Sequence, residues 1–477
     1  MEKDKIEIKE KEEKWHLVKD LGNVVGSEYV LYEKEQIKGY LTDETPEPVM
    51  PTYCSDVIVV KPESTEEISK IMKYANEKCV PVVVRGGGTG LCAGVVPIKP
   101  SIILSMERLN KVLEVDEKNL TLTCEAGVTL GSIFEKMADV KGLFFPPHPG
   151  DEGAHAGGLV VENAGGSRAV KYGVMRNFVR GMKVVLPTGE IINLGGKVVK
   201  NVTGYDLMHL MIGSEGTLGI ITEVILRLVP KVGETYTLVV PFEDVKGAIE
   251  VVPKILQSGI VPLAMEYIDK EAIPYGEKSA GEKWPSKEGD AHLMIIIEGR
   301  DEEELLSNAE DIETICQKHG ALDVLLADTT SEQKKILDVR SLIYDGSKAD
   351  VIEALDVSVP PSMIPDFVIK SQEIANKCGI RLIQYGHAAD GNVHQESLKT
   401  GLKEEWKERY PELKQKIFQL ASELRGVIAA EHGIGLTKRE DMYRVLSKKE
   451  IDLMCKIKSA FDPNNILNPE KVVSMEV

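Results

Sequence analysis

The first strong pattern along the chain is a strand, an amphipathic helix and a second strand. Residues 57–60 are four consecutive β-branched residues, and residues 82–84 are three valines. Between them, apolar residues recur at helical spacing, namely Ile68, Ile71, Met72, Ala75 and Cys79. Two buried strands joined by a helix form a βαβ unit, which places its strands parallel. We therefore expect a parallel sheet in this part of the chain.

The pattern then changes at about residue 230. Up to residue 229 the chain is rich in glycine and β-branched residues, and it predicts a helix over 130–140 and strands over 102–104, 120–123, 182–186, 190–192 and 220–226. After Pro230, long helical patterns alternate with strands such as residues 294–297, which is typical of an α+β unit with an antiparallel sheet. A chain of 477 residues is too long for one core. We divide it into a charged lead-in (1–40), a first domain (41–230), a second domain (231–425) and a closing segment (426–477).

The most distinctive segment is Gly-His-Ala-Ala-Asp-Gly-Asn-Val-His at residues 386–394. An Asp-Gly pair between two apolar runs predicts a hairpin with a two-residue turn. Counting outward from that turn pairs His387 with His394, with their Cβ atoms roughly 5 Å apart. Two imidazoles at that spacing can bind one divalent cation, and Glu431 and His432 offer a third ligand and a base. Two histidines beside a turn are more often surface or hydrogen-bonded residues than ligands, so the motif alone does not establish a metal site.

Composition excludes several classes of protein. The net charge of −18 argues against nucleic acid or an anionic membrane surface as a general partner. We expect no membrane span, because no run of about 18 apolar residues occurs, and no signal peptide, because the N-terminus is charged. The seven cysteines lack Cys-x-x-Cys spacing, which argues against a zinc ribbon or an iron–sulfur cluster held by this chain alone. These features predict a cytoplasmic protein with reduced thiols.

Three glycine-rich segments follow the predicted strands of the first domain. They are residues 85–94 (Arg-Gly-Gly-Gly-Thr-Gly-Leu-Cys-Ala-Gly), residues 146–166 and residues 200–219. Glycine lets backbone N–H groups approach an anion closely. The spacing differs from the G-x-G-x-x-G fingerprint, and Pro97 and Pro100 prevent a helix after the first loop. Three such clusters indicate one long ligand, so a large cofactor fits better than a small phosphate.

Together these motifs resemble the FAD-linked D-lactate and glycolate dehydrogenase branch of the vanillyl-alcohol oxidase/PCMH flavoprotein superfamily. The matching segments, in order along the chain, are PVVVRGGGTGLCAG, NAGG, NVTGYDL, GSEGTLGIITE, GHAADGNVH, AAEHGIG and FDPNNILNPEKV. The resemblance implies an α+β fold with a PCMH-type FAD-binding domain of two subdomains. It also implies a cap domain with an antiparallel sheet, and a C-terminal segment that returns to the FAD domain.

The resemblance further implies noncovalent FAD, because the 85–94 loop lacks the histidine that anchors flavin in some relatives. The residues it assigns to FAD are Arg85, Gly86, Gly87, Gly88, Thr89, Gly90, Leu91, Gly94, Pro147, Asp151, Gly157, Gly158, Gly165, Gly166, Tyr172, Gly173, Gly216, Gly219, Ile221 and Asn468, the last near the isoalloxazine. His148 and His155, which lie in the same segments, are expected in structural or rim positions.

In related 2-hydroxyacid dehydrogenases, the positions of His387, His394 and Glu431 bind a divalent metal. Zinc, iron(II) and manganese all suit these ligands, and spacing does not choose among them. The position of His432 is the acid/base, and that of Arg340 grips the substrate carboxylate. Without the resemblance, Arg340 would be read as a surface ion-pair residue and His432 as a residue that orients a ligand.

The resemblance implies oxidation of a D-2-hydroxy acid, above all D-lactate to pyruvate. Glu396 departs from the 2-hydroxyglutarate branch, and a carboxylate there would oppose a second substrate carboxylate. Glycolate or D-2-hydroxyglutarate dehydrogenase, a flavin oxidase that uses O₂, and a non-catalytic electron-transfer subunit of a glycolate-oxidase-like complex are the alternatives.

The electron acceptor has no signature in the chain, since neither an NAD fingerprint nor iron–sulfur ligands are present. Electrons would leave to a quinone, a cytochrome, an iron–sulfur subunit or an electron-transferring flavoprotein. The family includes lactate dehydrogenase subunits of complexes with electron-transferring flavoprotein. We therefore expect an oligomer or a complex subunit.

Overall fold

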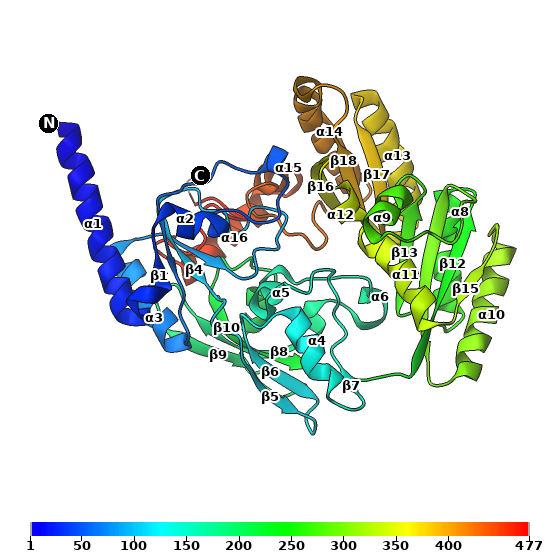
Figure 1. The fold of residues 1–477 in the computed structure, drawn as a ribbon, viewed down its shortest axis with the longest axis horizontal. Helices are drawn as coiled ribbons and strands as arrows, with labels where there is room; N and C mark the ends of the chain where they lie inside the picture. Colours follow the sequence, from blue (N-terminus) through cyan, green and yellow to red (C-terminus); the bar gives the residue numbers. More distant parts are fainter. Residues whose placement is uncertain (1, 476–477) are drawn as a thin grey trace.

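The computed structural model describes residues 2–475 as two domains with the closing segment packed between and against them (Figure 1). The long helix α1 (Glu2–Val25) projects from the first domain, and its C-terminal end is anchored there by the buried side chains of Leu21 and Val25. Among the described residues, no helix is long and apolar enough to cross a membrane. All seven cysteines are free thiols.

The first domain begins with a four-stranded sheet in the order β1 (Val30–Leu31), β2 (Val57–Val60), β4 (Ser101–Ser105) and β3 (Val82–Arg85). Strands β2 and β3 both lie parallel to β4, which confirms the βαβ prediction. Strand β4 lies between the two strands of that unit. Helix α3 (Thr65–Lys78) connects them and buries Ile68, Ile71 and Met72. The short helix α2 (Lys34–Ile37) precedes β2.

The second sheet of this domain is antiparallel, with the order β5 (Val112–Asp116), β6 (Thr121–Glu125), β10 (Ile220–Arg227), β8 (Val179–Val185) and β9 (Ile191–Gly195). A short pair, β7 (Leu143–Phe144) and β11 (Val229–Pro230), lies beside it. The connecting helices are α4 (Leu130–Ala138), α5 (Ala156–Glu162), α6 (Ala169–Tyr172) and α7 (Leu207–Met211). One hydrophobic core joins both sheets, with Ile58 and Ile102 from the first and Val184 and Val224 from the second.

The cap domain is a seven-stranded antiparallel sheet in the order β15 (Leu325–Ala327), β12 (Glu234–Phe242), β14 (Ala291–Gly299), β13 (Ala264–Asp269), β17 (Arg381–His387), β18 (Asn392–Leu398) and β16 (Val351–Ser358). Its two faces are both buried, because Leu238 and Val240 pack into one core and Val239 into another. The first core includes α8 (Val245–Gln257), α10 (Glu302–Lys318), α13 (Ile364–Cys378) and α14 (Lys403–Glu423), and the second includes α9 (Ile273–Ala280), α11 (Thr330–Ser341) and α12 (Ile343–Ser347).

The closing segment contains α15 (Arg439–Val445) and α16 (Lys448–Phe461). After α16 the chain lies beside β3, where Val82 donates its N–H to the carbonyl of Ile466 and accepts one from Asn468, both at 2.7 Å. The C-terminal segment therefore returns to the first domain, as the resemblance implies. Residues 427–429 lie beside β16 of the cap, so this segment contacts both domains.

The predicted two-residue hairpin turn is wrong. In the structure His387 pairs with Asn392, and His394 pairs with Tyr385, so four residues connect β17 and β18. Ala388 donates its N–H to the carbonyl of Met265 in β13 at 2.9 Å. Of the Asp-Gly pair, only Gly391 has a positive φ, which is 92°. The two histidines still lie on one face as diagonal neighbours, with ring centroids 5.3 Å apart.

Candidate active site

A cavity of about 1230 Å³ lies between the two domains. The three glycine-rich segments form one wall, and strands β12, β13, β14, β17 and β18 with helix α11 form the other. All residues that the resemblance assigns to FAD line this cavity except Arg85, Pro147, Tyr172 and Gly173. The structure thus brings together segments separated by more than three hundred residues in the sequence, from Gly86 to Asn468.

The excepted residues have other surroundings. Arg85 donates through Nη1 to the carbonyl of Thr42 at 2.7 Å, and its guanidinium folds over Gly88. Tyr172 donates its hydroxyl to Glu298 of the cap at 2.6 Å. Pro147 is buried, and Gly173 packs against Asn177 with a φ of 83°. Their predicted contacts with FAD stay predictions.

The cavity wall has the chemistry that a long dinucleotide needs. Within the described part of the chain, the backbone N–H groups of residues 87–91 donate no hydrogen bond to another protein atom, so they are available to an anion. Gly94 and Gly158 line the cavity, and a Cβ at either position would meet no atom within 4 Å. The floor is therefore bare backbone open to a ligand, and the residues present fit FAD.

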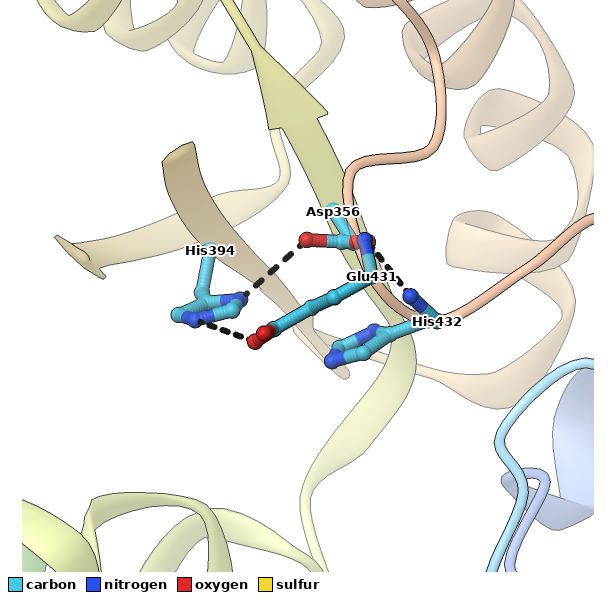
Figure 2. A group of neighbouring side chains, drawn as sticks. All are labelled: Asp356, His394, Glu431 and His432. Atoms are coloured by element: carbon cyan, nitrogen blue, oxygen red, sulfur yellow. Dashed lines mark hydrogen bonds and ion pairs between the residues drawn. The ribbon is translucent and has the colours of Figure 1, made fainter. Parts of the chain in front are cut away.

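At the other end of the cavity, four side chains converge, namely those of Asp356, His394, Glu431 and His432 (Figure 2). Their potential ligand atoms all lie within 4.8 Å of one another. Glu431 Oε1 lies 3.4 Å from His394 Nε2 and 3.7 Å from His387 Nε2. The predicted ligands His394 and Glu431 belong to this group, whereas His387 lies outside it and approaches it only through its contact with Glu431.

Two buried carboxylates hold these ligands from behind. Glu266 on β13 accepts from His387 Nδ1 at 2.7 Å, which leaves Nε2 facing Glu431. Asp356 on β16 lies 3.5 Å from His394 Nδ1 and accepts the backbone N–H groups of residues 430–432 at 2.7–3.0 Å. A carboxylate that accepts a histidine N–H, as Glu266 does, fixes the tautomer and orientation of a metal-binding histidine. Asp356 instead holds the backbone: its Oδ2 accepts the three N–H groups, and its Oδ1 accepts from Asn392 Nδ2 at 2.7 Å, so we assign it to orientation and not to the ligand set.

The charge of this group suits a cation. Burial lowers the pKa of His394 to about 3, so its imidazole is neutral. Burial opposes ionisation of Glu266, but His387 and Arg340 outweigh it and hold the pKa at about 2. The pKa of Glu431 is likewise lowered, because contact with His387 outweighs its burial. Burial opposes protonation of His387, but Glu266 and Glu431 outweigh it and raise its pKa well above the ordinary value, so its imidazole carries a proton that a bound cation would displace. Ionised carboxylates with imidazoles are a donor set that binds zinc, iron(II) or manganese.

Arg340 is buried, which the surface reading of the sequence did not anticipate. Its Nη2 donates to Glu266 Oε2 at 2.5 Å, and its guanidinium lies 4.7 Å from the centroid of the Tyr385 ring. The Nε has no hydrogen-bond partner in the described residues, and Arg340 lines the cavity. A guanidinium at a cavity wall is suited to a carboxylate, because its N–H groups can donate two parallel hydrogen bonds.

His432 lies beside the predicted ligands His394 and Glu431. Its ring stacks on that of His394, with centroids 5.4 Å apart and planes 11° apart. Its Nδ1 is buried without a hydrogen-bond partner among the described residues, and the residue lines the cavity. The His432 ring thus lies at the cavity wall beside His394.

The comparisons with known proteins agree with this geometry. Residues 57–195 match the family described as FAD binding domain, and residues 233–472 match FAD linked oxidases, C-terminal domain. The chain belongs to the FAD-linked oxidases. It is 46% identical to a D-lactate dehydrogenase of Archaeoglobus fulgidus over 434 residues, which are 91% of this chain and 95% of the relative. It is 39% identical to the glycolate oxidase subunit GlcD of Bacillus subtilis over 425 residues, 88% of this chain and 89% of the relative.

A solved structure of p-cresol methylhydroxylase with substrate bound has the same fold as this FAD-linked oxidase. The two share a TM-score of 0.77 at 18% sequence identity, over 96% of this chain and 97% of the other. The family resemblance and the PCMH-type fold that the motifs implied are thereby confirmed.

The interpretation of Glu396 was wrong. Its carboxylate does not line the cavity of this FAD-linked oxidase; it accepts from the hydroxyls of Ser347 and Tyr385. Burial raises its pKa to about 7. Glu396 therefore supports Tyr385, which packs against Arg340, and makes no direct contact with the cavity.

The supporting carboxylates Glu266 and Asp356 were not predicted from the sequence. Each lies in a largely apolar strand together with a second acidic residue, Asp269 in β13 and Glu353 in β16, and buried carboxylates in such positions need partners. Acidic residues within an apolar strand are the signal that could have found them. His148 and His155 both line the cavity of this FAD-linked oxidase, and His148 also stacks on Phe134 with centroids 5.5 Å apart.

Proposed function

We propose that this FAD-linked oxidase catalyses the FAD- and divalent-metal-dependent oxidation of a D-2-hydroxy acid, with D-lactate to pyruvate as its main reaction. The observation that carries the proposal is the close approach of the FAD-domain wall of the cavity to Glu431. A Cβ at Gly165, in the FAD-domain wall, would lie 2.6 Å from Glu431 Oε2. A substrate beside Glu431 and His394 would thus also lie beside the cavity wall that is predicted to bind FAD.

Arg340 and the cap wall would select the substrate. The guanidinium of Arg340, which lines the cavity, would hold the carboxylate, while Glu266 fixes its orientation through Nη2. Leu263, Met294 and Ile296 line the same wall, and their apolar surfaces favour a methyl substituent over a second carboxylate. D-Lactate meets both conditions, and glycolate is the second candidate because one relative is named a glycolate oxidase subunit.

His432, which lines the cavity, would take the proton of the substrate hydroxyl, while His394 holds its ring in place by stacking. A divalent cation bound by His387, His394 and Glu431 would supply Lewis acidity toward that hydroxyl. FAD, when bound, would supply the two-electron acceptor for the Cα–H bond. We further propose a protein or quinone as the final acceptor, such as an electron-transferring flavoprotein.

A dye-linked assay tests the substrate assignment. D-Lactate, L-lactate, glycolate and D-2-hydroxyglutarate are compared with wild type, His432→Gln and the control His209→Gln. His209 is an exposed residue that pairs with Asp206 and does not line the cavity. We expect D-lactate to give the highest kcat/KM, a loss on the order of 10²-fold or more in His432→Gln, and no change in the control. Equal rates in all three proteins would refute the role of His432, and substantial peroxide formation would favour the oxidase alternative.

A further inference from the structure

The loop that carries Glu431 and His432 is held by two carboxylates from different domains. Asp356 of the cap accepts three backbone N–H groups at its first half, from residues 430–432. Glu215 of the FAD domain accepts two at its second half, from Ile434 at 2.8 Å and from Gly435 at 2.7 Å, one on each oxygen. The role of Asp356 follows from its contact with His394, whereas nothing derived so far explains Glu215.

The backbone of Glu215 indicates that its side chain is needed. Its φ is 50°, in the left-handed region, and it lies between Gly213 at 77° and Gly216 at 65°. Glycine adopts this conformation freely, whereas a residue with a side chain does so at a cost. A third glycine would therefore be the easier choice at position 215. The carboxylate is also closely packed, since a Cβ at Gly433 would lie 3.1 Å from Glu215 Cδ.

The main chain at Glu215 belongs to the FAD wall. Asn468 donates through Nδ2 to the carbonyls of Glu215 at 3.3 Å and Gly216 at 3.0 Å, and it accepts from the N–H of Val84 at 3.0 Å. Val84 directly precedes the 85–94 loop, and Gly216 and Asn468 both line the cavity. Glu215 thus connects a backbone segment of the flavin wall to the loop of the proposed acid/base and metal ligand.

We propose that Glu215 is a positioning residue that sets the placement of Glu431 and His432 relative to the flavin wall. The proposal rests on the proposed function for its effect on turnover, but the placement itself can be measured without a substrate. Without Glu215, the half of the loop after His432 loses the hydrogen bonds of Ile434 and Gly435 to the FAD domain. It keeps those that Cys92 makes with Gly433 and Leu436, so we expect a displaced loop and not an unfolded one. Misplacing reacting groups by about 1 Å can cost on the order of 10²-fold in rate.

Three variants test this. Glu215→Gly removes both hydrogen bonds and also relieves the left-handed backbone, so loss of activity could not come from backbone strain. Glu215→Gln keeps one acceptor oxygen and turns an NH₂ group toward the other N–H. The control Glu223→Gln removes a carboxylate from the same domain, where Glu223 on β10 pairs with Lys183 outside the cavity. Because Glu215 also faces the ammonium groups of Lys438 and Lys471, thermal midpoint and FAD content are measured for every variant.

Hydrogen exchange of the peptide spanning residues 429–437 and the rate of flavin reduction by D-lactate are the two readouts, both on FAD-loaded protein. We expect faster exchange in this peptide in Glu215→Gly, and a reduction rate per bound FAD that falls about 10²-fold in Glu215→Gly and about tenfold in Glu215→Gln. Glu223→Gln should match wild type in both. Unchanged exchange would overturn the proposal. A rate that falls only in proportion to lost FAD would also overturn it, by making Glu215 a flavin-binding residue. Faster exchange in a protein whose wild type is not reduced by D-lactate would support the positioning role and refute the proposed function instead.

Discussion

Replacing Glu266 by glutamine tests the core of the cap site. Glu266 is 1% exposed and bonds Arg340 at 2.5 Å through one oxygen and His387 Nδ1 at 2.7 Å through the other. Glutamine has nearly the same shape, but it is neutral and can accept from only one of these two donors. The change therefore leaves the Arg340 guanidinium buried without a counter-charge.

The expected loss of stability follows from that burial. Removing one partner of a buried, hydrogen-bonded ion pair costs about 3 kcal/mol or more. For a domain of roughly 200 residues, this lowers Tm by roughly 6–12 °C. The same substitution releases His387 from its fixed orientation, which reduces metal affinity by about 10–100-fold.

Thermal melts of metal-free protein and metal titrations of the folded protein measure the two effects separately. The matched control is Glu298→Gln on the neighbouring strand β14, where Glu298 pairs with Lys171 at 2.7 Å and does not contact the histidines. It should lose less stability, because Lys171 is more exposed than Arg340, and should keep its metal affinity. Metal affinity within twofold of wild type in Glu266→Gln would refute the assignment of Glu266 to His387.

Three further changes are informative. Arg340→Lys keeps the charge but not the planar fork, so kcat/KM for D-lactate should fall on the order of 10²-fold; an unchanged KM and kcat would remove Arg340 from substrate binding. Gly165→Ala should displace Glu431, since the new Cβ would lie 2.6 Å from its Oε2, and the metal content of the protein should drop. The control Gly39→Ala, whose new Cβ meets no atom within 4 Å, should retain the metal content of wild type. Burial lowers the pKa of Lys471 to about 7 from 10.5, so the folded state binds fewer protons than the unfolded state between these values. The free energy of unfolding of wild type, relative to that of Lys471→Met, should then rise by about 1 kcal/mol per pH unit from pH 7 to pH 10, as measured by denaturant titration. If this difference in unfolding free energy does not change with pH, the buried, poorly solvated environment of Lys471 is contradicted.

Local sequence patterns predicted what depends on local structure. The βαβ unit around α3 and the change of architecture after Pro230 both follow from hydrophobic periodicity, and both are present in the structure. The hairpin turn at Asp390 and Gly391 failed because a third strand competes for the turn residues. Met265 of β13, more than one hundred residues earlier, accepts the N–H of Ala388. No local rule contains that partner.

The site shows the same division. The glycine loops and the His387, His394 and Glu431 set carry sequence signatures, and the fold brings them to one cavity. The residues that orient them, Glu266 and Glu215, depend on partners that are 121 and about 220 residues away in the chain. Glu396 was misread for the same reason, since only the fold shows that hydroxyl groups of Ser347 and Tyr385 bind its carboxylate.

The most direct test of the proposed function is anaerobic reduction of the bound flavin, followed by its absorbance, when D-lactate is added before and after treatment with a chelator. The geometry of Glu431, His387 and His394 predicts rapid reduction by D-lactate, slow or no reduction by L-lactate, and loss of reduction after chelation that returns with added zinc, iron(II) or manganese. Reduction that persists undiminished in protein shown to be metal-free would contradict the metal-dependent mechanism. No reduction by any of the four hydroxy acids, with FAD and metal both bound, would contradict the substrate assignment and favour an electron-transfer subunit.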